Sequence, residues 1–279
     1  MSTHNTFEPP REYARFSLSD RVQHAVMATS FLVLALTGLP QKFIYRNDRY
    51  LDDLIDLMGG LEAVRLIHRV AATVLMVVTV YHLLATAYRI LVRRVSLSML
   101  PRYQDVVDGL QAVRYNLGLA KERPRTDRYT WEEKVEYWSL IWGTVVMIAT
   151  GFMLWNPVAT ARFLPGEWIP AAQVIHGGEA LLAILAVLVW HFYSVHLRHF
   201  NRAMFTGRMT AEEMGHEHPL ELERIEAGAV PPGPGPVALA RRQKVFLPLA
   251  VVVAVLLLAW IYWFVTFEQT AITTLPPPR

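Results

Sequence analysis

The sequence predicts an all-α membrane protein in which a four-helix transmembrane bundle is followed by a fifth, C-terminal transmembrane helix. Only 18% of the 279 residues are charged, 53% are apolar, and the mean hydropathy is +0.25. Soluble proteins carry roughly a quarter charged residues, so this composition favours a chain that faces lipid. Five apolar windows, each long enough to cross a bilayer as a helix, supply the expected spans.

The expected spans follow one another along the chain, and each contains at most one charged residue. They are Val22–Leu39, which Pro40 is expected to end, Val70–Tyr88, whose helix begins near Glu62, Val135–Trp155, Ala171–Leu197 and Val245–Phe267. The segment Met1–Asp20 is polar and charged, so we expect no cleavable signal peptide and a first span that stays in the mature protein.

The loops divide the chain into three expected parts. Residues 1–209 form the four-helix bundle, residues 210–244 a cytoplasmic segment, and residues 245–279 a transmembrane anchor with a short outer tail. The cytoplasmic segment holds a charged, helix-permissive stretch, Thr210–Glu226, and a stiff linker rich in Pro and Gly, Gly228–Pro236. No internal repeat is obvious in the sequence.

The distribution of Lys and Arg predicts the orientation. The N-terminal segment, the loop between the second and third spans and the loop between the fourth and fifth spans together hold 20 of the 27 basic residues. Cytoplasmic loops carry this excess. We therefore expect a multi-pass protein of a bacterial or archaeal inner membrane, with a cytoplasmic N-terminus and an outer C-terminus.

The chain contains no cysteine. Disulfides, thiolate zinc sites, iron–sulfur clusters and covalently attached c-type haem all need cysteine sulfur, so these are excluded. A redox cofactor would have to be held by other side chains, and the ten histidines are the candidates. His4, His216 and His218 lie in polar segments, where we expect solvated side chains.

Four histidines are matched in face and depth on two expected spans. His68 and His82 lie 14 residues apart and His176 and His191 lie 15 apart, so at about 100° per residue each pair leaves one broad helix face. Both spans run from outside to inside. His68 and His176 are therefore expected near the outer surface, and His82 and His191 nearer the cytoplasm.

Two pairs of imidazoles at two depths are what two stacked haems require. A polar ring in hydrocarbon is costly unless it is paired or coordinates something, and haem iron accepts one neutral imidazole on each face. Iron with two protein ligands has no position for oxygen, which favours electron transfer. We expect two noncovalent haems b. His24, at the cytoplasmic end of the first span, is an alternative to His82 opposite His191, and it could also line a quinone pocket or form a hydrogen bond at the interface.

Residues near these histidines are further candidates. Gly177 and Gly178 leave room for a macrocycle to approach the backbone. Arg65 and Arg69 flank His68 and could pair with haem propionates or simply be charges at a helix end. Glu179 lies one turn after His176, where it could relay a proton to quinone or hydrogen-bond a neighbouring helix.

The residues Arg15–Phe43 (RFSLSDRVQHAVMATSFLVLALTGLPQKF), RLIHRV, YTWEEKVEYWSLIWGTVVMIATGFMLW and VIHGGEALLAILAVLVWHFY resemble the membrane cytochrome b (gamma) subunits of formate dehydrogenases and related hydrogenase cytochromes. The resemblance covers roughly Arg15–Met209. It implies two haems b that carry electrons between a partner redox subunit and membrane quinone. It also implies that His68 and His176 hold the outer haem and that His24 and His191 hold the inner one.

The sequence departs from the family pattern in three places. The family needs one histidine in the second span, but His82 adds another, and on depth and face we favour His82 narrowly over His24 as the partner of His191. Tyr129–Thr130 stands where family members often carry a Tyr-Asn pair near the quinone. The fifth span has no counterpart in the usual four-helix subunit.

The expected function is therefore that of a di-haem electron conduit across the membrane. It would connect the quinone or menaquinone pool with a redox partner, such as an iron–sulfur or molybdenum dehydrogenase, a hydrogenase or a multihaem c-type cytochrome. We expect no catalysis by this chain alone beyond quinone chemistry, and no nucleic-acid partner. The alternatives are a histidine-based metal or proton transporter and a structural membrane anchor.

Overall fold

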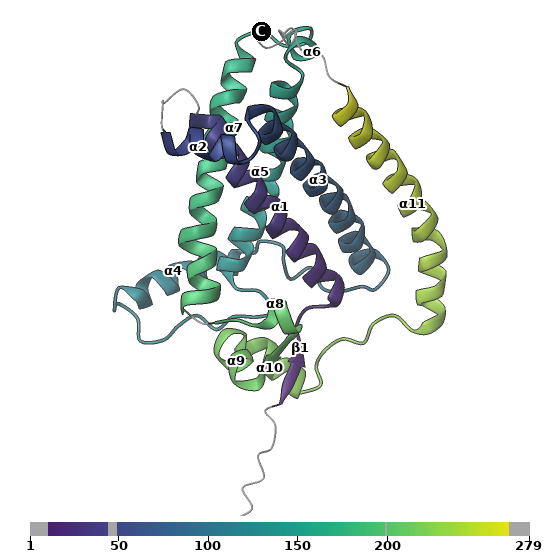
Figure 1. The fold of residues 1–279 in the computed structure, drawn as a ribbon. Helices are drawn as coiled ribbons and strands as arrows, with labels where there is room; N and C mark the ends of the chain where they lie inside the picture. Colours follow the sequence, from purple (N-terminus) through teal and green to yellow (C-terminus); the bar gives the residue numbers. More distant parts are fainter. Residues whose placement is uncertain (1–10, 44–48, 199, 268–279) are drawn as a thin grey trace, which may run out of the picture.

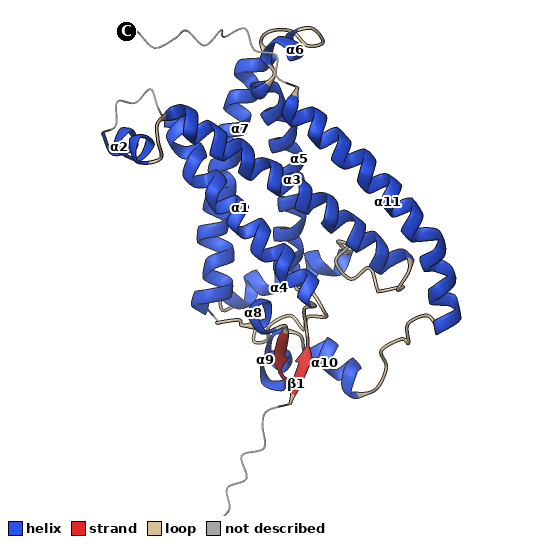
Figure 2. Ribbon diagram, turned by 45° about the vertical axis from the view of Figure 1, so that its right-hand side comes forward, coloured by secondary structure: helices blue, strands red, loops and turns tan. Residues whose placement is uncertain are grey.

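The computed structural model describes residues 11–43, 49–198 and 200–267. His4 and the tail expected after the fifth span lie outside these residues. Within them the chain is almost entirely helical (Figure 2), as the sequence predicts.

Five long helical segments dominate the fold, and each is long and apolar enough to cross a membrane. They are α1 (Leu18–Phe43), α3 (Leu61–Leu91), α5 (Trp131–Trp155), the continuous segment of α7 (Trp168–Leu185), η2 (Ala186–His191) and η3 (Tyr193–Arg198), and α11 (Pro236–Thr266). The five spans expected from hydropathy are confirmed. Their large apolar side chains are mostly exposed, which suits a protein whose surroundings are lipid.

The spans are arranged as two antiparallel hairpins and one added helix. α1 packs against α3, α5 packs against α7, and α1 also contacts α7, so the four helices enclose one interior. α11 runs along the outer side of α3 (Figure 1). The two hairpins have the same up-and-down direction, with α1 and α5 rising and α3 and α7 descending in Figure 1.

Two helix boundaries differ from the sequence expectation. Pro40 does not end the first helix, because α1 continues through it to Phe43. A proline removes one backbone hydrogen-bond donor and bends a helix, but the helix can continue beyond it. α11 begins at Pro236 rather than at Val245, so the fifth helix extends below its apolar window.

α11 contacts the four-helix bundle at both of its ends. Near its start, Gln243 donates a hydrogen bond of 2.7 Å to the Tyr88 hydroxyl. Near its end, Phe264 is buried together with Met76 of α3 and Ile261, and its ring centroid lies 5.0 Å from that of Phe152 on α5. The fifth helix is therefore attached to the bundle along its length, although a linker precedes it.

Short elements cover the lower end of the bundle in Figure 1. They are β1 (Glu12–Ala14), α4 (Tyr103–Asn116), α8 (Ala203–Thr206), β2 (Arg208–Thr210), α9 (Ala211–Glu217) and α10 (Pro219–Glu226); α2 (Arg49–Leu57) and α6 (Pro157–Ala161) lie at the upper end. β1 and β2 pair antiparallel, with Tyr13 opposite Met209. Gly207 adopts φ 82°, where a side chain would be strained, and a β-carbon there would lie 2.8 Å from the Phe16 carbonyl oxygen.

A buried ionic cluster fixes this lower cap to the bundle. Glu221 of α10 accepts bonds of 2.6 Å from Arg15 and from Arg128, two residues far apart in the sequence. His218 Nδ1 donates to the Asp127 carbonyl oxygen (2.8 Å), and its Nε2 lies 3.1 Å from Arg15 Nη2. His218 is only 1% exposed, so the expectation of a solvated side chain is wrong for this residue.

Burial disfavours the charged form of His218, and the two guanidinium groups disfavour it further. Desolvation, then Arg15 and Arg128, lower the pKa of His218 from 6.5 to about 3. The ring is therefore neutral at physiological pH. Its Nε2 accepts a hydrogen bond from Arg15, and its Nδ1–H satisfies a backbone carbonyl.

Candidate functional site

Histidines from three of the four bundle helices face the interior at two levels, and α5 contributes none. In the upper histidine layer, His68 of α3 and His176 of α7 have ring centroids 6.4 Å apart. In the lower histidine layer, His24 of α1 and His191 of η2 have ring centroids 6.2 Å apart. Neither pair is joined by a direct hydrogen bond in the described residues, so each pair leaves a gap between its rings.

The gap in each layer fits one metal ion. A metal–imidazole bond is about 2 Å long and the ring centre lies about 1 Å beyond the nitrogen, so two axial imidazoles on one iron have centres roughly 6 Å apart. Both measured separations agree with this value. The described residues contain no cluster of three or more His, Cys, Asp or Glu that could hold a bare metal ion. The donor set, two imidazoles only, is that of a haem.

His82 does not take part in this pairing. Its Nδ1 lies 3.0 Å from Gln23 Oε1, and its Nε2 lies 3.0 Å from the Tyr137 hydroxyl. Both ring nitrogens are thus occupied by protein groups. The expectation that His82 lies opposite His191 is wrong, because the structure puts His24 there.

Each ring of the upper layer is oriented by a threonine on the neighbouring helix. Thr37 Oγ1 lies 2.8 Å from His68 Nδ1, and Thr150 Oγ1 lies 2.9 Å from His176 Nδ1. Both hydroxyls already donate to a backbone carbonyl four residues earlier. They must therefore accept from Nδ1–H, which leaves the unprotonated Nε2 of each histidine free to bind a metal.

A glycine follows each of these threonines and makes room for the ring. A β-carbon at Gly38 would lie 3.2 Å from His68 Cε1, and one at Gly151 would lie 3.4 Å from His176 Cε1. Helix interiors disfavour glycine by about 1 kcal/mol relative to alanine. Close approach of the imidazole explains its presence at both positions.

The lower layer is oriented by a carboxylate. Glu136 Oε2 lies 3.0 Å from His191 Nδ1, so this ring too donates through Nδ1 and keeps Nε2 for a metal. The spacing from His176 to His191 is one residue longer than that from His68 to His82, and η2, a π-helical segment, lies within it. A π-helical turn accommodates an additional residue, so His191 points inward despite the longer spacing.

The two hairpins repeat the same arrangement of residues. Thr37-Gly38 on α1 corresponds to Thr150-Gly151 on α5. Likewise, Gln23-His24 on α1 corresponds to Glu136-Tyr137 on α5, because Gln23 and Glu136 each lie 14 residues before the threonine of their own helix. Gln23 binds His82 Nδ1 as Glu136 binds His191 Nδ1. The structure therefore reveals an internal repeat that was not obvious in the sequence.

The other residues singled out in the sequence lie around the upper layer. A β-carbon at Gly177 would lie 2.5 Å from Lys42 Nζ, so this glycine admits the lysine of α1 rather than an open space, whereas Gly178 has no heavy atom within 4 Å of that position. Arg65 pairs with Glu62 at 2.8 Å on the surface of its own helix. The Arg69 guanidinium lies 4.4 Å from the ring centroid of Trp155.

Glu179 and Tyr129 occupy different regions. A β-carbon at Gly143 of α5 would lie 2.8 Å from Glu179 Oε1, so the carboxyl group contacts the facing helix between the two layers. Tyr129 lies at the lower end of the bundle, with its ring centroid 5.3 Å from the Arg15 guanidinium and 5.6 Å from that of Arg128. Tyr129 thus belongs to the ionic cluster of the cap.

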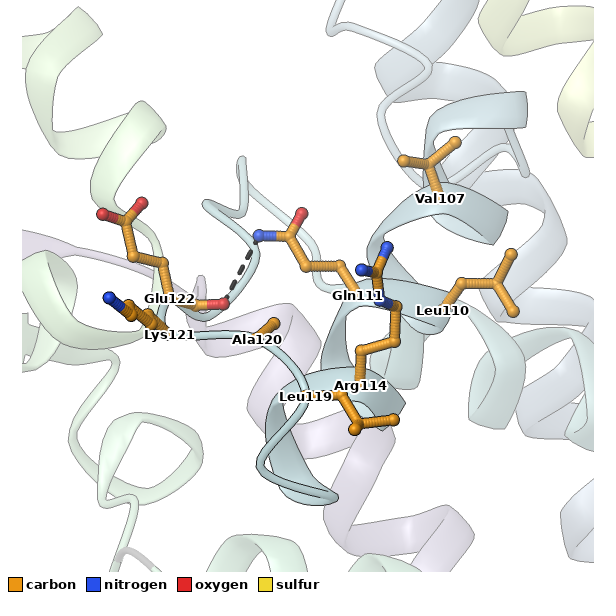
Figure 3. A pocket seen from close by; sticks show the side chains of 8 residues that line it. All are labelled: Val107, Leu110, Gln111, Arg114, Leu119, Ala120, Lys121 and Glu122. Carbon is orange, nitrogen blue, oxygen red and sulfur yellow. Dashed lines mark hydrogen bonds between the residues drawn. The ribbon is translucent and has the colours of Figure 1, made fainter.

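The surface hollow drawn in Figure 3 lies apart from the histidine layers. Residues of α4 and of the following loop line it: Val107, Leu110, Gln111, Arg114, Leu119, Ala120, Lys121 and Glu122. The Gln111 side chain donates a bond of 3.4 Å to the Glu122 carbonyl oxygen across it. None of these residues comes from a helix face that carries a histidine, so the candidate site is the bundle interior.

Residues 15–209 match the family model described as prokaryotic cytochrome b561. The chain belongs to that family. The matched range includes both hairpins and ends before α11, so both histidine layers lie within the matched region and the fifth helix lies outside it. The protein is accordingly a multi-pass membrane cytochrome b, which binds haem b and transfers electrons.

Similar proteins include subunits of formate dehydrogenases. The cytochrome b556(fdo) subunit of formate dehydrogenase from Escherichia coli (strain K12) is 21% identical over 208 residues, which are 74% of this chain and 89% of the relative. The cytochrome b556(Fdn) subunit of the nitrate-inducible formate dehydrogenase of that strain is 20% identical over 216 residues, 76% of this chain and 93% of the relative. The corresponding Shigella flexneri subunit gives the same values. The resemblance to gamma-type cytochrome b subunits is thereby confirmed.

Proposed function

We propose that the protein carries two haems b, one in each histidine layer. His68 and His176 would hold the upper haem, and His24 and His191 would hold the lower haem. The observation that carries the proposal is the separation of the ring centroids, 6.4 Å in the upper layer and 6.2 Å in the lower layer. In addition, Nδ1 of His68, of His176 and of His191 is occupied by a protein group, which leaves Nε2 of each ring for the iron. Bound haem supplies a reversible one-electron couple at each level.

The side chains of this chain position and tune the ligands. Thr37 and Thr150 hold the upper imidazoles in the tautomer that binds metal, and Glu136 does the same for His191 with a negative charge. A carboxylate partner makes an imidazole more electron-donating than a neutral hydroxyl does. The lower haem would therefore have the lower midpoint potential. Lys42 lies beside Gly177, and Arg69 follows His68 in the sequence and lies over the Trp155 ring. Both would supply positive charge for the propionates of the upper haem.

We propose that the two haems connect membrane quinone with a redox partner subunit. Formate dehydrogenase subunits are among the similar proteins, which supports a partner of the metal-containing dehydrogenase class. Quinone chemistry belongs at the lower layer, where polar and ionisable side chains gather, and the partner belongs at the upper end. The excess of Lys and Arg in the lower loops supports a cytoplasmic position for that end.

The experiment that tests the two-haem proposal is spectroscopic. Purified protein should give a b-type dithionite-reduced minus oxidised difference spectrum, and the pyridine haemochrome assay should yield two haems per chain. Addition of a soluble quinol should reduce at least the lower haem. One haem per chain would contradict the two-layer assignment, and full haem content without any reduction by quinol would contradict the quinone role.

A further inference from the structure

The proposed haem sites leave one group of polar side chains in the lower layer without a role. His82 of α3 lies between Gln23 of α1 and Tyr137 of α5, at 3.0 Å from each. The ring centroids of His82 and Tyr137 are 5.9 Å apart. The three side chains come from three different helices and form a continuous hydrogen-bonded chain.

The hydrogen bonds fix the tautomer of His82. Gln23 Nε2 donates to the Ser19 carbonyl oxygen at 3.0 Å, and a carbonyl can only accept. The amide oxygen of Gln23 therefore faces His82 and accepts from its Nδ1–H. His82 is neutral with its lone pair at Nε2, and the Tyr137 hydroxyl donates to that lone pair. Nε2 is thus a basic nitrogen whose described partner is a phenol.

The hydrogen-bonded group of Gln23, His82 and Tyr137 adjoins the lower haem site in the sequence. Gln23 immediately precedes His24, and Tyr137 immediately follows Glu136, which binds His191. The pair Gln23-His24 on α1 and the pair Glu136-Tyr137 on α5 thus each place one residue in the lower haem site and one residue on His82, at the same depth. An electron that enters this layer adds negative charge beside His82, and in a medium of low polarity such a charge favours uptake of a proton nearby.

The charged groups around His82 are committed to other partners. Asp20 of α1 pairs with Arg89 of α3, and Glu136 of α5 binds His191. Arg242 of α11 reaches the Leu91 carbonyl oxygen at the end of α3. No carboxylate forms a hydrogen bond with His82 among the described residues. The neutral imidazole, with its lone pair at Nε2 facing the Tyr137 hydroxyl, is therefore the group here that can gain a proton.

We propose that His82 binds and releases the proton that accompanies electron transfer at the lower layer. The inference rests on the proposed two-haem function. When one electron enters the layer, Nε2 of His82 gains one proton from water, and the new imidazolium donates to Gln23 Oε1 and to the Tyr137 oxygen. When the electron leaves, the N–H bond at Nε2 breaks and the proton is returned. Quinone reduction consumes one proton for each electron, so a group that holds one proton per electron is placed where that chemistry needs it.

A redox titration of the full-length holoprotein in detergent tests the inference without relying on turnover. The midpoint potential of the lower haem should fall as the pH rises from about 5.5 to about 8.5. His82→Gln should abolish that dependence while both haems remain bound. Thr79→Val is the matched control, because Thr79 lies one turn before His82 on α3 but its hydroxyl donates to the Leu75 carbonyl oxygen of its own helix, at 2.8 Å; this variant should keep the wild-type dependence.

A second variant keeps the test decisive if His82→Gln loses haem. Gln23→Glu puts a carboxylate on Nδ1–H of His82, which favours the imidazolium and should move the pH-dependent range upward by about one to three pH units. A range that does not move, or a dependence that persists in a haem-replete His82→Gln variant, would overturn the inference and leave His82 as an interhelical brace. Wild-type protein without haem would instead refute the proposed function itself.

Discussion

Glu136 Oε2 lies 3.0 Å from His191 Nδ1, whereas the two histidines of the upper layer bind threonine hydroxyls through the same atom. The two proposed haems thus differ in the charge of the group that orients a ligand. Outer hydrogen-bond partners of this kind tune the electronic character of a metal ligand. This difference alone would lower the midpoint potential of the proposed lower haem relative to the upper one.

Neutralising Glu136 should raise the midpoint potential of the lower haem. Glu136→Gln retains an oxygen that can accept from Nδ1–H but removes the negative charge, so we expect an increase on the order of tens of millivolts. Potentiometric titration of the haem spectrum measures it. Thr150→Ser, which keeps the neutral hydroxyl at His176, is the control and should change neither potential appreciably. A shift confined to the upper haem in Glu136→Gln would contradict the assignment.

Adding a methyl group at either threonine-linked glycine should impair the upper haem. A β-carbon at Gly38 would lie 3.2 Å from His68 Cε1 and one at Gly151 would lie 3.4 Å from His176 Cε1, so Gly38→Ala should have the larger effect. We expect lower occupancy or a broadened spectrum of the upper haem only. Gly166→Ala, in the loop before α7, has open space at that position and should bind haem as the wild type does. Equal haem content in all three variants would show that ring clearance is not limiting.

The cap should lose stability as the pH falls below neutrality. Unfolded His218 has a pKa near 6.5, but burial and the adjacent Arg15 and Arg128 lower its folded pKa to about 3. Between these values the unfolded chain binds the proton and the folded chain does not. The contribution of His218 to stability is therefore complete above pH 6.5 and is lost toward pH 3, at up to about 1.4 kcal/mol per pH unit.

Unfolding of the detergent-solubilised protein at several pH values measures this effect. His218→Gln should flatten the dependence between pH 6.5 and pH 4, whereas His216→Gln, at an exposed position two residues earlier, should retain it. If both variants keep the wild-type slope, the acid sensitivity originates elsewhere, for instance in the carboxylates of the cap.

Removing the central carboxylate of the cap should be strongly destabilising. Glu221 accepts from both Arg15 and Arg128, and the side chains of Arg15 and Glu221 are 2% and 8% exposed. Glu221→Ala would leave two guanidinium groups near one another without their shared anion, at a cost of about 3–5 kcal/mol. Limited proteolysis of the segment after the fourth span measures loosening of the cap. Glu223→Ala, at an exposed ion pair with Arg125, should have little effect.

Much of the bundle could be predicted from the sequence, because its signals are local. Apolar windows predicted all five spans. His68 and His176 were expected in one layer because each lies near the start of a span and the two spans run in the same direction, and the structure brings them together. The partner of His191 could not be chosen in this way. Extrapolation at a uniform 100° per residue takes no account of the π-helical segment that ends at His191, and the depth of His24 depends on where α1 begins.

Other residues were missed because their role depends on a neighbouring helix. Thr37, Thr150 and Glu136 orient histidines 26 to 55 residues away in the sequence. The sequence does contain a pattern that marks Thr37 and Thr150, since the dipeptide Thr-Gly occurs at corresponding positions of the first and third spans. His218 was misjudged because its burial requires β1, β2 and the loop before α5 to assemble, which local polarity does not reveal.

The central claim is that His24, and not His82, holds the lower haem with His191. Its most direct test is the haem count of two matched variants, each purified as the full chain and assayed by pyridine haemochrome together with the difference spectrum. The account predicts one haem per chain in His24→Ala, with the upper haem intact, and two haems per chain in His82→Gln. Two haems in His24→Ala together with one in His82→Gln would contradict it.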